Sequence, residues 1–142
     1  MGTPHLFYIN KGELMKLLYL ISMTRPGNSI MAAIGVVVGF LFSGNSSRSD
    51  LLLLIVSASV SLGFGNVIND LYDIDTDKIA HPDRALPSGK VTANEAKLFM
   101  GFLALLALTA SFIVSPLHGI ATIIPLILLI AYANWLKGTP LA

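Results

Sequence analysis

Three acidic or amide side chains stand at regular spacing at the end of a long apolar stretch of this chain, and a fourth lies beside them. Asn69, Asp73 and Asp77 follow one another at intervals of four residues, and Asp70 lies beside them. On one continuous helix, each step of four residues advances about 6 Å and drifts by about 40°, so these three side chains would share a face. Carboxylate and amide oxygens suit Mg²⁺, which shares its coordination shell with substrate phosphates. The spacing therefore indicates a magnesium site on the face that these three side chains share.

The acidic segment lies in an apolar chain, where placing its negative charges is energetically unfavourable. Five of the eight acidic residues lie between Asp70 and Asp83, whereas the 142-residue chain is 54% hydrophobic and only 12% charged. Soluble domains carry about twice that charged fraction, so a multi-pass membrane protein is the expected class. Carboxylates at the mouth of a membrane bundle need compensation, most simply by a metal ion. A solvated acidic cap is the alternative, but acids at a helix C-terminus oppose the helix dipole.

Several other classes of chemistry are disfavoured by residue type and position. The chain has no cysteine, which excludes disulfides and thiolate metal sites. Its nine Lys and Arg residues form no dense basic stripe, so no nucleic-acid partner is expected. A calcium-binding EF-hand loop starting at Asp73 would need glycine where Lys78 stands and glutamate where Arg84 stands.

Hydrophobic periodicity predicts an all-α bundle with four membrane helices. The segment 13–23 is amphipathic and is expected to lie at the membrane interface before a break at Arg25. The first span, 29–43, is short for a bilayer and should recruit part of that segment. Thr92 and Glu95 predict a capping box at the start of the third span. The remaining expected segments are a second span at 51–71, a polar loop at 74–91, a third span ending near 115, a tight turn at 116–119 and a fourth span at 120–135.

The positive charges predict an orientation in the cell membrane. Eight of the nine Lys and Arg residues fall on one side of the four expected spans, and only Arg48 falls on the other. Because Lys and Arg concentrate in cytoplasmic loops, the acidic segment and its loop should face the cytoplasm. The eight residues on that side are Lys11, Lys16, Arg25, Lys78, Arg84, Lys90, Lys97 and Lys137.

The run from Asn69 to Thr92, NDLYDIDTDKIAHPDRALPSGKVT, resembles the UbiA superfamily of intramembrane prenyltransferases. It carries an NDxxDxxxD pattern and then the Pro-Asp-Arg-x-Leu-Pro-Ser-Gly segment. Arg25-Pro26-Gly27-Asn28 and the turn 137–140 resemble the same family. The resemblance extends from about residue 14 to the last residue. Within the family, the segment 63–66 and the sequence of 73–77 are most similar to the archaeal branch that makes digeranylgeranylglyceryl phosphate.

The resemblance implies a fold, a reaction and a set of site residues. The fold would be a bundle of about nine spans with two acidic motifs, of which residues 1–142 supply the N-terminal half, ending after the fourth helix. The reaction would be Mg²⁺-dependent transfer of a geranylgeranyl group from its diphosphate to geranylgeranylglyceryl phosphate in membrane ether-lipid synthesis. Its substrates would be an isoprenyl diphosphate donor and a lipid acceptor. The expected phosphate contacts are Arg25, Asn28, Arg84 and Lys90. By motif position, the Mg²⁺ ligands would be Asn69, Asp73 and Asp77, with Asp70 as a weaker candidate, and Asp73 and Asp77 would be the catalytic pair.

Two other functions remain open at this point. A protein of the same superfamily can prenylate an aromatic acceptor, as in quinone, chlorophyll or haem synthesis, with the same acidic motif. A membrane half-protein without the second acidic motif can instead bind a metal without catalysis. The spaced aspartates of CDP-alcohol phosphotransferases come in another order, which makes that class a poor match.

Overall fold

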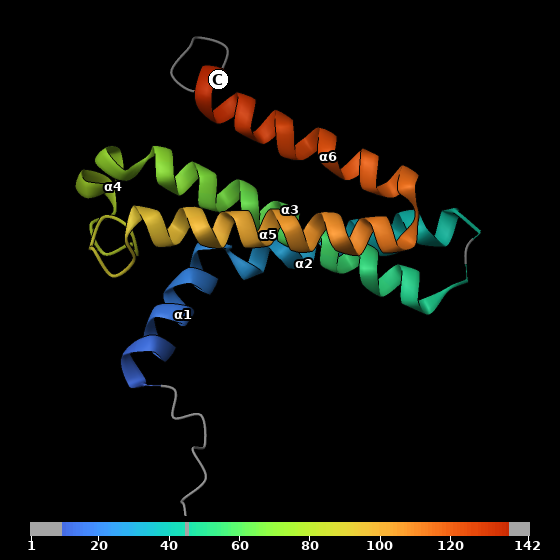
Figure 1. Ribbon diagram of the computed structural model, residues 1–142, viewed down its shortest axis with the longest axis horizontal. Coiled ribbons are helices and arrows are strands. Elements are labelled where there is room, and N and C mark those ends of the chain that lie inside the picture. Colours follow the sequence, from blue (N-terminus) through green and yellow to red (C-terminus); the bar gives the residue numbers. More distant parts are fainter. Residues whose placement is uncertain (1–9, 45, 137–142) are drawn as a thin grey trace, which may run out of the picture.

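The computed structural model describes residues 10–44 and 46–136, and these residues form helices joined by short connections (Figure 1). The fold is the all-α membrane bundle that the sequence predicts. No β-strand occurs in these two ranges. The turn at 137–140 lies outside the described residues. The helices are α1 (Lys11–Met23), α2 (Pro26–Phe42), α3 (Arg48–Tyr72), α4 (Ile74–Ala80), α5 (Ala93–Val114) and α6 (Pro116–Ala131), and α6 runs into a π-helical turn, η1 (Tyr132–Leu136).

Among the described residues, three segments are long and apolar enough to cross a membrane alone, and a fourth span forms if α1 and α2 are counted together. The three are α3, α5 and α6 continued through η1. The α1–α2 pair passes the same test jointly and is bent by 51°. This agrees with the expectation that the first span recruits the preceding segment.

The bend between α1 and α2 has a local cause at Arg25. Arg25 adopts a left-handed backbone with φ 52° and is followed by Pro26, the first residue of α2. A residue before proline is disfavoured in the right-handed helical region, so α1 ends just ahead of it. The break packs on α3, where the Asn66 side chain donates to the Thr24 carbonyl at 2.9 Å. An added Cβ on Gly63 would lie 3.0 Å from Thr24 Cβ, so this close packing needs glycine.

The predicted polar loop at 74–91 is wrong in its first part, because residues 74–80 form α4. Asp73 ends α3 and begins α4, with φ −93° and ψ 6°. Acidic residues at the end of α3 would oppose its dipole, whereas the new helix places Asp75 and Asp77 in a first turn, where acids are stabilising. Breaking the helix therefore converts an unfavourable charge distribution into a favourable one.

Hydroxyl groups cap the start of α5 and the start of α6. At its start the Thr92 hydroxyl accepts from the Glu95 N–H, and the Glu95 carboxylate accepts from the Thr92 N–H, which confirms the predicted capping box. After α5 the chain reverses at extended Ser115, whose hydroxyl caps α6. The tight turn predicted at 116–119 is wrong, because Pro116 is already the first residue of α6, a position that proline favours.

Helix α3 lies at the centre and packs against α2, α5 and α6. The buried core of this bundle contains Val67 of α3 and Ala96 and Leu103 of α5. Gly35 and Gly39 of α2 form a small-xxx-small pair of the kind that brings helices together, but an added Cβ on either residue would meet nothing within 4 Å. In the described part of the chain the close contacts are instead at Gly63, at Gly65, which faces Leu129 of α6, and at Gly119, which faces Phe112 of α5.

Candidate functional site

The acidic segment lies where four parts of the chain meet at one end of the bundle (Figure 1). These parts are the α1–α2 break, the end of α3, the short helix α4 and the turn that leads into α5. The turn is folded against the bundle, because Leu86 and Val91 are buried and the Val91 N–H donates to the Ala85 carbonyl at 3.0 Å. We call this region the ionic end, defined by Arg25, Asp70, Asp77 and Arg84.

The first ion pair of the ionic end joins α3 to the α1–α2 break. Arg25 Nη2 donates to Asp70 Oδ1 at 2.8 Å. The Asp70 side chain is only 12% exposed, whereas that of Arg25 is 41% exposed. The carboxylate is thus the inner member of the pair and the guanidinium the outer one.

The second ion pair repeats this arrangement between α4 and the following turn. Arg84 Nη1 donates to Asp77 Oδ2 at 2.7 Å, with side-chain exposures of 39% for Arg84 and 7% for Asp77. The charges of Arg84 and Asp77 also act on Asp70, so the two pairs are close enough to interact. Each guanidinium has five N–H donors, and its bond to the carboxylate leaves others directed outward.

The other acidic residue of α4 points away from this assembly. Asp75 is fully exposed and accepts from Lys78 Nζ at 2.8 Å. That hydrogen bond, together with the lysine charge, holds the pKa of the Asp75 carboxyl below its usual value. Asp75 and Lys78 therefore offer a matched control for Asp77 and Arg84.

The remaining predicted site residues are less closely gathered. Asn69 and Asp73 are half-buried on either side of the helix break, and the Asp73 N–H donates to the Asn69 carbonyl at 3.0 Å. Asn28 is exposed in the first turn of α2. Lys90 donates to the Asp83 carbonyl at 3.1 Å and lies 5.1 Å from the centroid of the Tyr19 ring.

The prediction that Asn69, Asp73 and Asp77 share one continuous helical face is wrong, because the helix breaks at Asp73. In residues 10–44 and 46–136, no three His, Asp or Glu side chains gather as a metal cluster. The donor chemistry nevertheless fits Mg²⁺, which is held in many phosphate-binding sites by one or two carboxylates, waters and substrate oxygens. Asp77, Asp73 and Asn69 carry oxygen donors of that type.

Sequence reasoning missed the residues that hold the ionic end in place. Asn66 is buried and ties α3 to the α1–α2 break through the Thr24 carbonyl, and Gly63 lets that break approach. Gly63, Asn66 and Asp70 follow one another at helical spacing on α3. That spacing was readable from the sequence, but nothing in it identified the Thr24 carbonyl as the partner.

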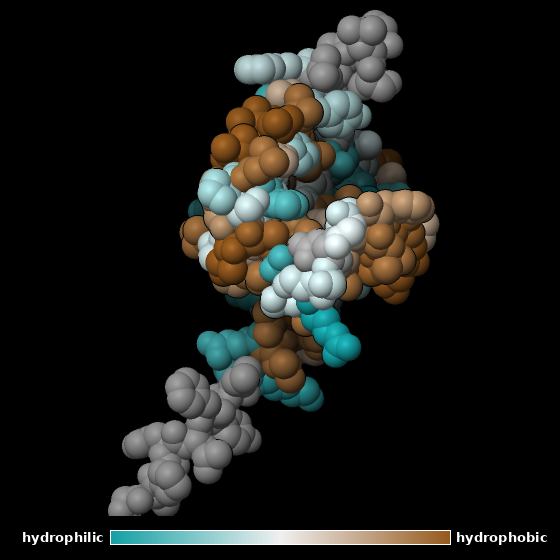
Figure 2. Space-filling view, turned by 90° about the vertical axis from the view of Figure 1, so that its right-hand side faces the viewer, coloured by the Kyte–Doolittle hydropathy of each residue, from teal (hydrophilic) through white to brown (hydrophobic). Residues whose placement is uncertain are grey.

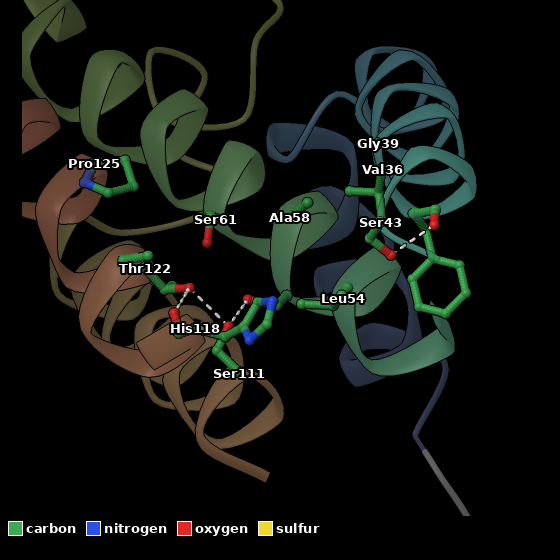
Figure 3. A pocket seen from close by; sticks show the side chains of 13 residues that line it. Val36, Gly39, Ser43, Leu54, Ala58, Ser61, Ser111, His118, Thr122 and Pro125 are labelled. Carbon is green, nitrogen blue, oxygen red and sulfur yellow. Dashed lines mark hydrogen bonds between the residues drawn. The ribbon is translucent and has the colours of Figure 1, made fainter. Parts of the chain in front are cut away.

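A second polar group lies at the far end of the bundle, around a cavity of about 640 Å³ between α2, α3, α5 and α6 (Figure 3). Ser57 and Ser111 are 2.6 Å apart, and Ser111 and Thr122 are 2.7 Å apart. Ser57 also donates to the Ala107 carbonyl at 3.0 Å. We call Ser57, Ser111 and Thr122 the hydroxyl cluster. Seen from this end, hydrophobic surface covers the sides and paler, more hydrophilic surface lies between (Figure 2).

The fold and the ionic end define a multi-pass membrane bundle that carries half-exposed guanidiniums over buried carboxylates. Residues 32–142 match the family described as the UbiA prenyltransferase family. The chain belongs to the UbiA prenyltransferase family. This confirms the family that the motif between Asn69 and Thr92 indicates.

Individual relatives agree with this assignment. The chain is 37% identical over 130 residues to a digeranylgeranylglyceryl phosphate synthase of Methanococcoides burtonii, covering 84% of this chain and 46% of that protein. It is 41% identical over 102 residues to the protein of the same name from Methanocaldococcus jannaschii, covering 70% and 36%.

A solved structure is also similar, with a TM-score of 0.81 and 36% identity, covering 87% of this chain and 45% of that one. It is described as concerning the biosynthesis of digeranylgeranylglyceryl phosphate synthase in membranes. The chain thus spans about half the length of the relatives that it matches.

Proposed function

We propose that this chain forms the diphosphate-binding half of an enzyme that transfers a geranylgeranyl group from its diphosphate to geranylgeranylglyceryl phosphate. The observation that carries the proposal is that the two ion pairs are arranged in the same way. In each pair the acid is buried and the guanidinium is about two-fifths exposed. Two cations held outward at the mouth of an apolar bundle suit an anionic head joined to an apolar chain. The names of the relatives from Methanococcoides burtonii and Methanocaldococcus jannaschii support the ether-lipid pathway.

In this reaction the ionic end would stabilise the diphosphate leaving group. The bond between the prenyl carbon and the diphosphate oxygen breaks, and its electron pair leaves with the diphosphate. The acceptor hydroxyl oxygen forms the new bond to that carbon and loses its proton. Arg25 and Arg84 would donate hydrogen bonds to the diphosphate as its charge grows, with Asp70 and Asp77 keeping both guanidiniums in position. Asn28 and Lys90 would contact phosphate at the edge of the same mouth.

We propose Mg²⁺ as the cofactor, held by Asp77 and Asp73 with help from Asn69 and, more weakly, Asp70. When bound it would neutralise charge on the diphosphate, which lowers the barrier to its departure. The chain's own carboxylates orient the cation at the mouth of the bundle, and the apolar helices exclude water from the prenyl group. The ionic end would face the cytoplasm, as the distribution of Lys and Arg indicates.

The family resemblance implies a second acidic motif in a further set of helices. We propose that residues 1–142 correspond to the N-terminal half of that bundle and that the complete protein supplies the remainder. This agrees with the coverage of only 46% of the Methanococcoides burtonii relative.

The acceptor is the least constrained part of the proposal. An aromatic acceptor would use the same ionic end with a different second pocket, and a non-catalytic half-protein would bind Mg²⁺ without turnover. The chain's similarity to relatives named for glyceryl phosphate chemistry favours the lipid acceptor.

An acceptor comparison tests this function. The complete protein in lipid bilayers is supplied with labelled geranylgeranyl diphosphate and Mg²⁺, and with either geranylgeranylglyceryl phosphate or 4-hydroxybenzoate. Product with the glyceryl phosphate alone is expected. Product with the aromatic acid alone would keep prenyl transfer but overturn the lipid acceptor. Mg²⁺ binding without product from either acceptor would favour the non-catalytic alternative.

A further inference from the structure

A second cavity, of about 490 Å³, adjoins the ionic end on the side of α5 and α6. Each of three helices contributes a short stripe to it. Helix α3 gives Ile68, Leu71 and Tyr72, α5 gives Ala93, Lys97 and Met100, and α6 with η1 gives Ile130 and Asn134, while Ile74 of α4 completes the wall. The walls are mostly apolar, and the polar groups are few.

The polar groups of this cavity are fixed by contacts between helices. The Tyr72 hydroxyl donates to the Asn134 side-chain oxygen, which ties the end of α3 to η1. The Asn134 amide nitrogen donates to the Ile130 carbonyl at 2.8 Å. Asn134 is therefore held by two partners, and its contact with Tyr72 fixes one side of the cavity.

Among the described residues that line this cavity, Lys97 is the one that carries a charge. Other cations near this end have partners: Lys16 binds Glu95 at 2.6 Å, and Lys78, Arg25 and Arg84 bind aspartates. No hydrogen bond or ion pair joins Lys97 to another residue in the described part of the chain. A cation without an internal partner, above apolar walls, is suited to an external anion.

We propose that this cavity binds the phosphate head of a lipid, with the phosphate against Lys97 and the apolar chain along Ile68, Met100 and Ile130. Ile74, which follows Asp73 directly, lines the cavity, so a bound head would lie next to the ionic end without using Arg25 or Arg84. Two sources have this chemistry, namely the glyceryl phosphate acceptor and a membrane phospholipid. Assignment to the acceptor rests on the proposed function, and assignment to a phospholipid does not.

The alternative is that Lys97 is an ordinary basic residue at a membrane boundary. Such a residue contributes to orientation, but it does not distinguish one phosphate-bearing lipid from another. Lys78 is a suitable comparison, because it is an exposed lysine on α4 that does not line the cavity.

The test uses the complete protein in phosphatidylcholine nanodiscs, with Lys97→Gln, Lys97→Arg and Lys78→Gln. One arm measures KM for geranylgeranylglyceryl phosphate and for geranylgeranyl diphosphate. If the acceptor occupies the cavity, Lys97→Gln raises the acceptor KM about tenfold, as expected for the loss of a charge-assisted hydrogen bond. The donor KM and kcat stay within about twofold, Lys97→Arg restores the acceptor KM, and Lys78→Gln leaves it unchanged.

The other arm measures retention of phosphatidic acid by native mass spectrometry and needs no turnover. A loss of retention in Lys97→Gln alone, with an unchanged acceptor KM, assigns the cavity to a phospholipid. This arm stays readable if wild-type protein makes no product, which separates failure of the proposed function from failure of the cavity. Unchanged values in both arms, or equal changes in Lys97→Gln and Lys78→Gln, would overturn the proposal.

Discussion

The two ends of α3 handle buried polarity in different ways. Toward its C-terminus, Asp70 is neutralised by Arg25, and Asp77 of α4 by Arg84, each pair having one buried and one half-exposed member. Thirteen residues earlier, about 20 Å along the helix, the buried Ser57 is satisfied entirely within the bundle.

The contrast follows from the cost of taking each group out of water. A hydroxyl needs only one or two neutral partners, and the hydroxyl cluster finds them on facing helices and on a backbone carbonyl. A carboxylate far from water needs a full opposite charge. The ionic end meets that need with guanidiniums that remain accessible, whereas the hydroxyl cluster has no charge to offer. The first arrangement suits an anionic ligand, and the second holds helices together.

Removing the outer cation of one pair should have the largest effect. Arg84→Gln leaves Asp77 buried beside a neutral side chain. We expect prenyl transfer by the complete protein to fall about 100-fold, the scale seen when one electrostatic stabiliser is lost. Initial rates check this, with Lys78→Gln as the control that removes a fully solvated pair. A similar rate for both variants would contradict a special role for Arg84.

The effects of changing Arg25 and Asp70 on the free energy of unfolding should be coupled. Asp70→Ala is expected to lower the free energy of unfolding by about 1–3 kcal/mol, less than for a fully buried pair because Arg25 is 41% exposed. The double variant with Arg25→Ala should lose less than the sum of the single variants. Unfolding in mixed micelles measures the three values. Strict additivity would mean that the ion pair does not hold the α1–α2 break to α3.

A change in the hydroxyl cluster should affect stability but not chemistry. Ser111→Ala removes the side chain that contacts both Ser57 and Thr122, at an expected cost of about 1–2 kcal/mol. Turnover of the folded fraction should stay within about twofold. Thr109→Ala, an exposed position on the same helix, is the control. A large loss of turnover without a loss of stability would place the hydroxyl cluster in the reaction.

The smallest effect, and one of opposite sign, is expected at Ser61. Its hydroxyl oxygen is buried and has no hydrogen-bond partner among the described residues. Because an unsatisfied hydroxyl is costly, Ser61→Ala should leave stability unchanged or raise it by up to about 1 kcal/mol. The same unfolding assay reads this change. A clear loss of stability would show that Ser61 makes a contact within the cavity at the far end.

Most of the fold was predictable from composition and local signals. The capping box at Thr92, the long apolar segments and the break at Arg25 each depend on signals within a few residues, and the structure has all three. One of the errors lies where charge decides the outcome. The α4 segment reads as a polar loop because it is acidic, yet its acids stabilise a helix once the chain breaks at Asp73.

The sequence named the residues of the ionic end, but it did not show which of them contact one another. Arg25, Asp70, Asp77 and Arg84 were all named from the sequence, and the structure brings them together. The sequence offered no means to see that Asp70 pairs with Arg25, because that contact joins residues 45 positions apart. Lys97 was counted only as a positive charge, since the cavity beside it is formed by three separate helices.

The most direct test of the account compares two neighbouring aspartates of one short helix. Asp77→Asn and Asp75→Asn are made in the complete protein, and prenyl transfer to geranylgeranylglyceryl phosphate is measured with Mg²⁺. Asp77 is buried in the ionic end, whereas Asp75 is solvated. The account predicts that Asp77→Asn loses at least about 100-fold in rate, while Asp75→Asn stays near wild type. Equal rates for the two folded variants would contradict the assignment of the ionic end as the site of prenyl transfer.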